Sequence, residues 1–244
     1  MVECLVTHRT RAISCHSFHV HLYIRRNIIA ASCHDIDQEF PALILAAGAS
    51  SRFGRSKAML SLSGHVGGEQ TLLDCAIGQG RVLSRDVRVV CGAWYPLIRF
   101  RCRVQPSRWV PVADWHEGVS ASLAAGIRSL GPQVKGVFVL VADQPLLDQD
   151  ALRAFGEVAR GFPKLPAAAD YGRRPGVPAY LPRWLWPQVL ELEGDQGAGR
   201  LLMEVNATRL IIPGVHDDID TPEDWVSIRE SLNQTSLQAR RFPN

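Results

Sequence analysis

Residues 42–57 read ALILAAGASSRFGRSK and contain the signals that decide the fold. The first five residues form a continuous apolar run, which is typical of a strand buried on both faces of a parallel sheet. Small residues follow at once, so backbone N–H groups can approach a ligand closely and point into one concavity, as a phosphate chain requires. Arg52 and Lys57 add a forked and a point-like positive charge. The stretch therefore predicts a strand followed by an anion-binding loop, although a solvated surface loop has a similar composition.

Strands and helices alternate along the rest of the chain. The strongest further strand is Gly136–Asp143, an apolar run that ends on an acid. Other expected elements are strands at Val87–Cys91 and Ala207–Ile212, and helices at Thr71–Arg85, from near Ser120, after an Asp148 cap, at Trp184–Leu192, at Arg200–Val205 and after a Thr221 cap. A Gly/Pro-rich segment lies at Phe162–Pro182. The alternation predicts an α/β fold, a Rossmann-like three-layer α/β/α sandwich with a mostly parallel sheet.

Composition excludes several classes of protein. The chain has 244 residues, of which 46% are hydrophobic and 21% charged, so wholesale disorder is out. No apolar stretch approaches the roughly 18–20 residues that span a bilayer. The net charge of +3 is too small to indicate nucleic-acid binding. The six cysteines form no C-x-x-C pair. We therefore expect reduced thiols in a cytoplasmic protein, with neither a membrane nor a nucleic acid as partner.

The first forty residues differ from the rest. They hold five of the eight histidines and three of the six cysteines, without a clear helical or strand period. The His and Cys spacing at 15–21 matches no common zinc pattern, and the apolar piece at 28–31 is too short for a signal peptide. We expect residues 1–40 to be an N-terminal extension outside the fold, residues 41–232 to form the domain, and residues 233–244 to be a C-terminal tail.

Two familiar phosphate-binding loops do not fit the stretch after the first strand. A Walker A loop has four residues between its glycines and a lysine directly after the second, whereas here five residues separate Gly48 from Gly54 and Arg55 follows. The dinucleotide motif G-x-G-x-x-G is also absent. The loop resembles instead the A-A-G-x-S-x-R-x-G-x-x-K signature of the MobA/MocA-like nucleotidyltransferases, the group that contains the molybdenum cofactor cytidylyl- and guanylyltransferases. All fixed positions match, namely Ala46, Ala47, Gly48, Ser50, Arg52, Gly54 and Lys57.

Later segments resemble further blocks of that family in the same order. They are WHEGVSASL at 115–123, ADQP at 142–145, PGVP at 175–178, GDQGA at 194–198 and DIDTPED at 218–224. The resemblance covers residues 41–232 and implies the fold of the nucleotide-diphospho-sugar transferases.

The resemblance also implies a reaction. In nucleotidyl transfer, a phosphate oxygen of the acceptor attacks the α-phosphate of an NTP and pyrophosphate leaves, so positioning and charge neutralisation dominate catalysis. By resemblance, Arg52 and Lys57 are the catalytic residues that hold the triphosphate. The implied nucleotide-binding residues are Ala46, Ala47, Gly48 and Ser122, the last contacting the base or ribose. Read without the family, Ser122 is an ordinary polar residue in a first helical turn.

The implied cofactor is Mg²⁺, bound by Asp143 and Asp220, with Asp218 as a weaker candidate. Magnesium prefers oxygen ligands and usually takes one or two carboxylates, with phosphates and water completing its shell. Asp143 also follows the strongest strand, where a doubly wound sheet places its ligand crevice. Read without the family, Asp143 is a turn or helix-cap aspartate.

The resemblance favours CTP as the nucleotide and the molybdopterin cofactor as the phosphorylated acceptor, because the loop reads Ala-Ala-Gly rather than the Ala-Gly-Gly common in guanylyltransferases. The sequence departs from the motifs of this family at some positions that could determine which acceptor or base is bound. Val177 replaces the histidine of a frequent Gly-His-Pro motif, and Arg200 comes one place late after Gly-Asp-x-Gly-Ala. Alternatives are another acceptor, such as a sugar phosphate or phospholactate, and a non-catalytic chaperone that holds the molybdenum cofactor. A molybdoenzyme of the xanthine dehydrogenase type is the protein partner to expect.

Overall fold

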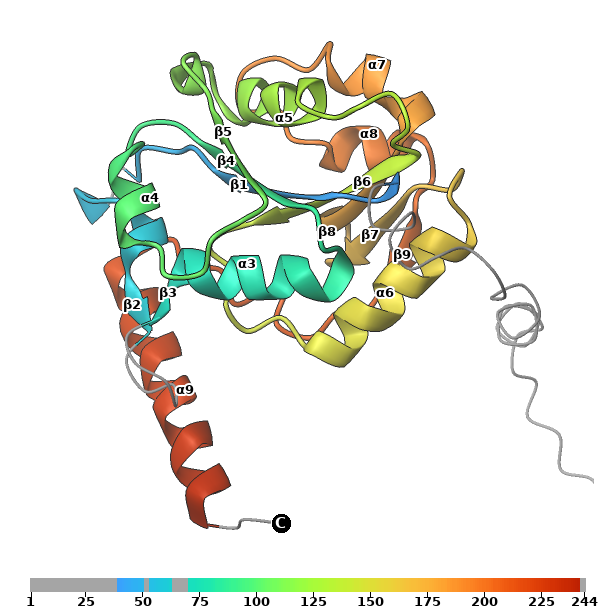
Figure 1. The fold of residues 1–244 in the computed structure, drawn as a ribbon. Helices are drawn as coiled ribbons and strands as arrows, with labels where there is room; N and C mark the ends of the chain where they lie inside the picture. Colours follow the sequence, from blue (N-terminus) through green and yellow to red (C-terminus); the bar gives the residue numbers. More distant parts are fainter. Residues whose placement is uncertain (1–38, 51–52, 63–69, 242–244) are drawn as a thin grey trace, which may run out of the picture. The chain divides into compact units, whose positions relative to one another are not determined.

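A computed structural model describes residues 39–50, 53–62 and 70–241, with residues 233–241 described by their backbone only. Arg52 and all but the last two residues of the expected N-terminal extension lie outside the described residues. The described part of the chain is built around one central sheet (Figure 1).

The central sheet has seven strands, most of them parallel. In spatial order they are β5 (Arg108–Pro111), β4 (Val87–Cys91), β1 (Ala42–Ala46), β6 (Gly136–Val141), β8 (Pro175–Pro182), β7 (Ala167–Asp170) and β9 (Thr208–Leu210). Only β8 runs against its neighbours, pairing antiparallel with both β6 and β7. A separate antiparallel pair is formed by β2 (Ser61–Leu62) and β3 (Gln70–Thr71). The mostly parallel sheet that the sequence predicts is confirmed.

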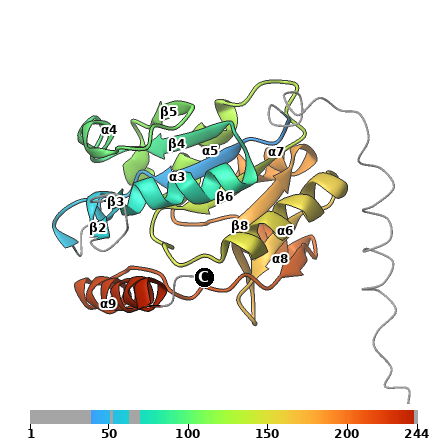
Figure 2. The ribbon, with the colours of Figure 1, turned by 60° about the horizontal axis from the view of Figure 1, so that its bottom comes forward.

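Helices cover both faces of the sheet and complete the three layers. One face is covered by α3 (Leu72–Leu83) and α6 (Gln149–Gly161), and the other by α5 (Val119–Arg128), α7 (Trp186–Val189) and α8 (Gly199–Glu204) (Figures 1 and 2). Side chains of β1 alternate between the two cores, since Ile44 packs on the side of α3 while Leu43 packs on the side of α5. Burial on both faces is the reason that β1 reads as an unbroken apolar run.

The C-terminal helix α9 (Pro222–Arg241) packs beside the β2–β3 pair, where Ile228 joins a small core with Leu62 and Leu72 (Figure 1). It begins as the sequence predicts. The Asp224 N–H donates to Thr221 Oγ1 (3.2 Å), and the Thr221 N–H donates to Asp224 Oδ2 (2.7 Å), which satisfies backbone groups at the helix start. The helix continues through residues 233–241, the segment expected to be a tail.

Two parts of the sheet were not predicted. The Gly/Pro-rich segment Phe162–Pro182 contains β7 and β8, and β5 was missed as well. Three prolines in β8 make it read as a connection, yet such residues are tolerated where a ladder hydrogen bond is not needed. β5 is an edge strand of four residues that begins and ends on exposed side chains, so it carries little apolar signal. A short helix, α4 (Leu97–Arg101), precedes it.

The helix caps tie neighbouring segments to the core. Asp148 accepts from the Ala151 N–H (2.8 Å) at the start of α6, as the sequence predicts. Asp74 closes a capping box with Thr71 at the start of α3, and it also accepts from the N–H groups of Arg103 (2.8 Å) and Val104 (2.7 Å). Asp74 thereby joins α3 to the loop that follows α4.

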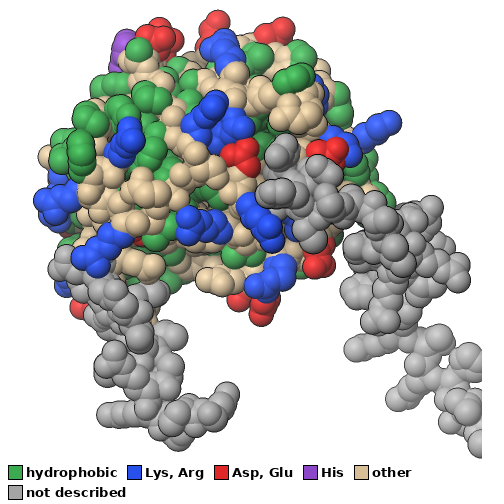
Figure 3. Space-filling view, in the orientation of Figure 1, with side chains coloured by type: hydrophobic (Ala, Val, Ile, Leu, Met, Phe, Trp, Pro, Cys, Tyr) green, Lys and Arg blue, Asp and Glu red, His purple; other side chains and the backbone are tan. Residues whose placement is uncertain are grey.

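The surface of the described residues carries mixed charge. Lys and Arg side chains are spread across the face shown in Figure 3, among acidic, apolar and uncharged groups. Among the described residues, none of the helices combines the length and the apolarity needed to span a bilayer. The cysteines in this part of the chain, Cys75, Cys91 and Cys102, are all free thiols.

Candidate functional site

The candidate site lies at the carboxyl end of β1, where the topology of the sheet switches direction. β1 is flanked by β4 on one side and β6 on the other, and all three run parallel, so the loops that follow them meet at one edge. Such a switch point leaves a crevice beyond the strand ends. The described residues 47–50 and 53–57 of the loop after β1 lie there, and Asp143 follows β6.

The loop after β1 is anchored by the segment that follows β4. The Ala93 N–H donates to the Ala47 carbonyl (3.1 Å), and Trp94 Nε1 donates to the Ala49 carbonyl (2.8 Å). Gly92 permits this close approach, because a Cβ there would clash with Trp115 and with the Ala47 carbonyl. These contacts hold the first residues of the loop close to β4.

Lys57 connects the loop to two carboxylates from distant parts of the chain. Its ammonium nitrogen lies 3.1 Å from Asp143 Oδ2 and 3.0 Å from Asp220 Oδ1, and it donates to the Ile219 carbonyl (2.8 Å). The Ile219 N–H donates to the Asp143 carbonyl (3.0 Å), so the two acidic segments are also joined to each other. Three residues assigned to the site by the resemblance therefore lie together in the structure.

Local structure sets the direction of the Lys57 side chain. Lys57 begins a 3₁₀ turn (Lys57–Met59), and its N–H donates to Ser50 Oγ (3.1 Å) across the loop. Ser50 has a φ of 53°, a left-handed conformation that Ser adopts rarely. The hydrogen bond between these two signature residues closes the loop and turns the lysine toward the carboxyl edge of the sheet.

Lys57 is charged in this setting. Burial by itself would lower the pKa of Lys57, but the neighbouring carboxylates of Asp143 and Asp220 outweigh it and raise the pKa above its ordinary value of 10.5. A raised pKa means that these contacts stabilise the fold at pH values below about 10.5 and lose their effect as the pH rises through the raised pKa. At neutral pH the site thus holds an ammonium between two carboxylates.

The same two carboxylates fit a divalent cation. Asp143 and Asp220 converge on one positively charged nitrogen, and both are hard oxygen donors of the kind that Mg²⁺ takes one or two at a time. The described residues contain no cluster of three or more His, Cys, Asp or Glu side chains that could hold a metal by themselves. The donor set therefore suits a cation that brings phosphate and water ligands with it.

Two cavities open beside Lys57, Asp143 and Asp220. The smaller cavity has a volume of about 520 Å³ and lies against the loop after β1. It is lined by Leu45, Ala46, Gly48, Ser50, Phe53, Ser56, Lys57, Ala58, Val119, Ala142, Asp143, Asp195 and Asp220. The backbone of the signature loop and Lys57 can contact an anion in the smaller cavity, whereas the carboxylates of Asp143, Asp195 and Asp220 call for a cation beside it.

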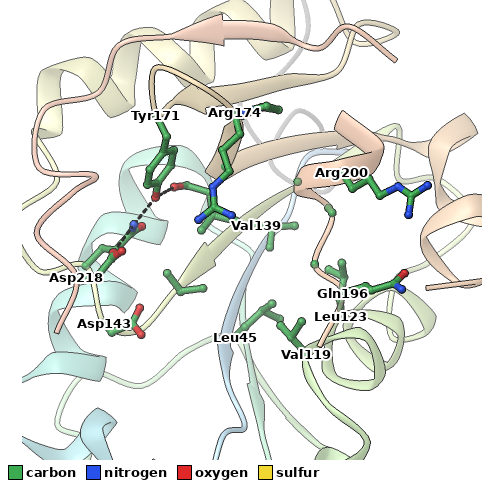
Figure 4. Close-up of a pocket in the computed structure, with 18 of the residues that line it drawn as sticks. Leu45, Val119, Leu123, Val139, Asp143, Tyr171, Arg174, Gln196, Arg200 and Asp218 are labelled. Atoms are coloured by element: carbon green, nitrogen blue, oxygen red, sulfur yellow. Dashed lines mark hydrogen bonds between the residues drawn. The ribbon is translucent and has the colours of Figure 1, made fainter. Parts of the chain in front are cut away.

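The larger cavity, about 590 Å³, lies on the other side of the carboxylates, between β6, β8 and the loop before α8 (Figure 4). Its walls are mainly apolar, with Leu45, Val119, Leu123, Val139, Val141, Val177 and Met203 among them. Two segments at which the sequence departs from the family that it resembles are part of the lining of this cavity, namely 175–177 from β8 and 196–200 around the start of α8. The cavities share Leu45, Val119, Asp143 and Asp220, so ligands held in the two would meet at the carboxylates.

A buried polar cluster supports one wall of the larger cavity, and the sequence did not predict it. Gln144 is 2% exposed, and its amide nitrogen donates to Asp218 Oδ1 (2.8 Å) and to the Tyr171 hydroxyl oxygen (2.6 Å). The Tyr171 hydroxyl donates in turn to the Val177 carbonyl (2.7 Å) (Figure 4). The one available signal was the ADQP block, in which Gln144 directly follows Asp143. Tyr171 belongs to the segment taken for a connection.

The weaker metal candidate, Asp218, belongs to this buried cluster. Burial raises the pKa of Asp218, the hydrogen bond from Gln144 lowers it, and the nearby charges of Asp143 and Asp220 raise it further. The net pKa lies above the ordinary value. The Asp218 carboxylate is held by Gln144, whereas those of Asp143 and Asp220 are held by Lys57.

The remaining predicted site residues are placed differently. Ala46 and Gly48 line the smaller cavity, but Ala47 is buried and its carbonyl accepts a hydrogen bond from the Ala93 N–H. Ser122 is 5% exposed and lines neither cavity, because the cavity side of α5 is occupied by Val119 and Leu123, one turn apart. The structure therefore does not bring Ser122 to the lining of either cavity, so its contact with the base or ribose stays a prediction, and Arg52 lies outside the described residues.

The start of α5 is joined to the loop before α8. The Ser120 N–H and the Ser120 hydroxyl both donate to the Gly194 carbonyl (3.1 and 2.7 Å). Gly118 has a φ of 107°, and a Cβ there would clash with Gly194, so a glycine is required on both counts. Two blocks that resemble the family, 115–123 and 194–198, thus meet beside the cavities.

Comparison with known proteins agrees with this architecture. A family model described as the MobA-like NTP transferase domain matches residues 42–209. The purine catabolism protein PucB of Bacillus subtilis (strain 168) is 31% identical over 207 residues, which cover 78% of this chain and 96% of that protein.

Two solved structures share the fold. A homolog of Mycobacterium tuberculosis Rv0371c from Mycobacterium sp. strain JC1 matches with a TM-score of 0.67 and 23% identity, covering 81% of this chain and 98% of that chain. A nucleotidyl transferase from Methanothermobacter thermautotroptrophicus matches with a TM-score of 0.65 and 21% identity, covering 81% of this chain and 99% of that chain. The family model and the identity to PucB carry the assignment: the chain belongs to the MobA-like NTP transferase family.

Proposed function

We propose that the protein is a Mg²⁺-dependent nucleotidyltransferase that moves NMP from an NTP to a phosphorylated acceptor and releases pyrophosphate. The observation that carries the proposal is the position of Lys57 between Asp143 and Asp220, at the place where the two cavities meet. This arrangement puts positive charge where phosphates from both cavities would come together.

The residues of the chain have separable tasks in this reaction. The smaller cavity would hold the triphosphate against the backbone of the signature loop, and Lys57 would neutralise charge on the α-phosphate and on the departing pyrophosphate. The larger cavity would hold the acceptor so that its phosphate oxygen faces the α-phosphorus. The bond from that oxygen to the α-phosphorus forms as the bond from the α-phosphorus to the pyrophosphate oxygen breaks. No proton needs to move if the acceptor phosphate is ionised.

Asp143 and Asp220 would hold the metal ion. When bound there, Mg²⁺ supplies positive charge to the phosphate oxygens. Lys57 then has to leave the position that it takes between the two carboxylates and move toward the phosphates. Its flexible four-carbon stem and single point of charge suit that movement, which the planar guanidinium of an arginine would not make as easily.

CTP and the molybdopterin cofactor are the substrates that we propose. The Ala46-Ala47-Gly48 sequence supports CTP through the family resemblance. The size and the mainly apolar walls of the larger cavity suit an acceptor with a ring system. The name of the relative PucB, a purine catabolism protein, agrees with a xanthine-dehydrogenase-type partner, because oxidation of a purine ring is the reaction of such enzymes.

A nucleotide screen tests the reaction first. The unfolding temperature of the full chain is measured with each of the four NTPs, with and without Mg²⁺. We expect the largest rise for CTP with Mg²⁺, because ligand binding stabilises the native state. Pyrophosphate release is then measured with the molybdenum cofactor, a sugar phosphate and phospholactate. Release with the first alone supports the proposal, and release with another acceptor corrects the substrate. Nucleotide binding without any pyrophosphate release overturns the enzyme in favour of a binding protein.

A further inference from the structure

Arg174 gives the larger cavity a positive charge, and the proposed function assigns no role to this residue. It lies in the turn between β7 and β8, where the Tyr171 N–H donates to the Arg174 carbonyl (3.1 Å). Figure 4 shows the Arg174 side chain reaching into the cavity and ending beside Tyr171. The neighbouring Arg173 is not among the residues that line the cavity.

Arg174 is available for a ligand, whereas the other cation of this cavity is engaged. Arg200 Nε donates to Glu204 Oε1 (2.8 Å), and its guanidinium extends away from Tyr171 and the carboxylates in Figure 4. Within residues 39–50, 53–62 and 70–241, no acidic side chain forms an ion pair with Arg174. The hydroxyl of the neighbouring Tyr171 forms its hydrogen bonds with Gln144 and with the Val177 carbonyl rather than with the Arg174 guanidinium.

The surroundings of Arg174 define what it would bind. The carboxylates of Asp143 and Asp218 lie on the same side of the cavity as Tyr171 in Figure 4, so the cavity pairs one free guanidinium with an acidic edge. The rest of the cavity lining is mainly apolar and includes Val139 and Val177. A guanidinium presents a planar fork of donors that matches two oxygens of a phosphate. The ligand that fits is an organic phosphate monoester with an apolar body.

We propose that Arg174 is a specificity-determining residue that binds the phosphate of the acceptor and directs it toward Asp143 and Asp220. This inference rests on the proposed function, because it assigns the larger cavity to the acceptor. Arg174 has no part in holding the nucleotide, since it does not line the smaller cavity.

Phenyl phosphate is a probe that carries both an aromatic body and a phosphate monoester. The full chain is first saturated with Mg²⁺ and a non-hydrolysable CTP analogue, which fills the smaller cavity. Binding of phenyl phosphate is then titrated by ligand-observed NMR. We expect Arg174→Gln to raise the Kd about 10-fold to 100-fold, which corresponds to the loss of hydrogen bonds to a charged group. The Kd of Arg174→Lys should lie between those of the native chain and Arg174→Gln, because lysine keeps the positive charge but lacks the planar fork of donors.

Arg173→Gln is the matched control, one position away with the same change in charge. It should leave the Kd of phenyl phosphate within about twofold. Equal weakening by both variants, or an unchanged Kd in Arg174→Gln, overturns the inference. The affinity for the CTP analogue is measured in every variant and should not change, which shows that the variants remain folded.

The two proposals can fail separately. If the native chain binds no nucleotide, the proposed function fails, and the titration of phenyl phosphate to the nucleotide-free chain still tests Arg174. Once an acceptor is known, Arg174→Gln should raise its KM by a similar factor and leave the KM of the nucleotide unchanged. A rise in the KM of the nucleotide instead would remove Arg174 from the acceptor site.

Discussion

The ammonium of Lys57 lies 3.1 Å from Asp143 Oδ2, although 86 positions separate the two residues in the chain. The contact joins the loop after β1 to the turn after β6, the two segments that flank the smaller cavity. Asp220 approaches the same nitrogen from a third segment, so three parts of the chain converge on a single charge. The predictions below concern this convergence and the packing that supports it.

Replacing Lys57 with Ala should lower turnover by about 10²–10³, because the developing charge on the phosphates loses a positioned cation. The measurement is the rate of pyrophosphate release at saturating nucleotide and acceptor. Lys164→Ala is the control, since Lys164 is exposed and lines neither cavity. A near-native rate in Lys57→Ala would remove Lys57 from the reaction.

Replacing Lys57 with Met should tighten the binding of Mn²⁺ in the absence of nucleotide, by about tenfold or more. The native ammonium occupies the space between Asp143 and Asp220, and its removal leaves two carboxylates without their counter-charge. Free Mn²⁺ is measured by electron paramagnetic resonance during a titration. Addition of Asp220→Asn to the variant should abolish the gain. An unchanged Mn²⁺ affinity in Lys57→Met would mean that lysine and metal do not compete.

Replacing Asp143 with Ala should abolish detectable pyrophosphate release while leaving the fold intact. Asp143, like Asp220, lines both cavities and contacts Lys57, so its loss removes a proposed metal ligand and one of the two carboxylate partners of the lysine together. Circular dichroism and the unfolding temperature verify the fold. Asp217→Ala is the nearby control, because Asp217 is exposed and lines neither cavity. Unchanged turnover in Asp143→Ala would refute the metal assignment.

Replacing Asp74 with Asn should destabilise the protein by about 2–3 kcal/mol. In the native protein backbone N–H groups donate to the Asp74 carboxylate, whereas the amide of Asn would place its own N–H groups against some of these donors. Asp74 is 1% exposed, and it accepts from the N–H groups of Thr71 (2.9 Å), Arg103 and Val104. Urea unfolding at neutral pH measures the difference. Asp150→Asn, on the exposed start of α6, should change the free energy of unfolding by less than about 0.5 kcal/mol.

The same variant carries a pH signature. Burial would raise the pKa of Asp74, but hydrogen bonds from Val104, Thr71 and Cys102 outweigh it and lower the pKa below its ordinary value of 3.8. A lowered pKa in the native state stabilises the fold above pH 3.8, and that stability is lost as the pH falls through the lowered pKa. The difference in free energy of unfolding between the native protein and Asp74→Asn should therefore become smaller in acid. A difference that is constant from neutral pH to pH 2 would contradict this account.

Prediction of the fold from sequence succeeded where burial dictates the residue pattern. β1 and β4 have the bounds that their apolar runs predict, because parallel strands that are covered on both faces admit few polar residues. The bounds of β6 differ only at its end, which lies two residues before the expected Asp143. The reverse holds for β8, whose prolines and glycine hide an eight-residue strand. Its pairing with β6 and β7 is set by tertiary contacts, which a local pattern does not contain.

The candidate site divides along similar lines. Lys57, Asp143 and Asp220 were named because a family motif identifies them, since no spacing rule relates residues so far apart in the chain. Gln144, Tyr171 and Arg174 were missed, because an amide, a phenol and an arginine next to glycine and proline carry no signal until the fold brings them to one cavity. The role of Ser122 stays a prediction, because this motif position is buried beside Val119 and Leu123, the residues of α5 that line the cavity.

The small core between α9 and the β2–β3 pair determines where a shortened fragment of this protein can end. The family match ends at residue 209, and the last strand of the sheet ends at Leu210. A fragment trimmed to that match would keep nearly all of the sheet and both of its main cores, yet it would lose Asp220 and the Ile219 carbonyl that hold Lys57. Fragment boundaries for expression or fusion should therefore follow the last helix rather than the sheet.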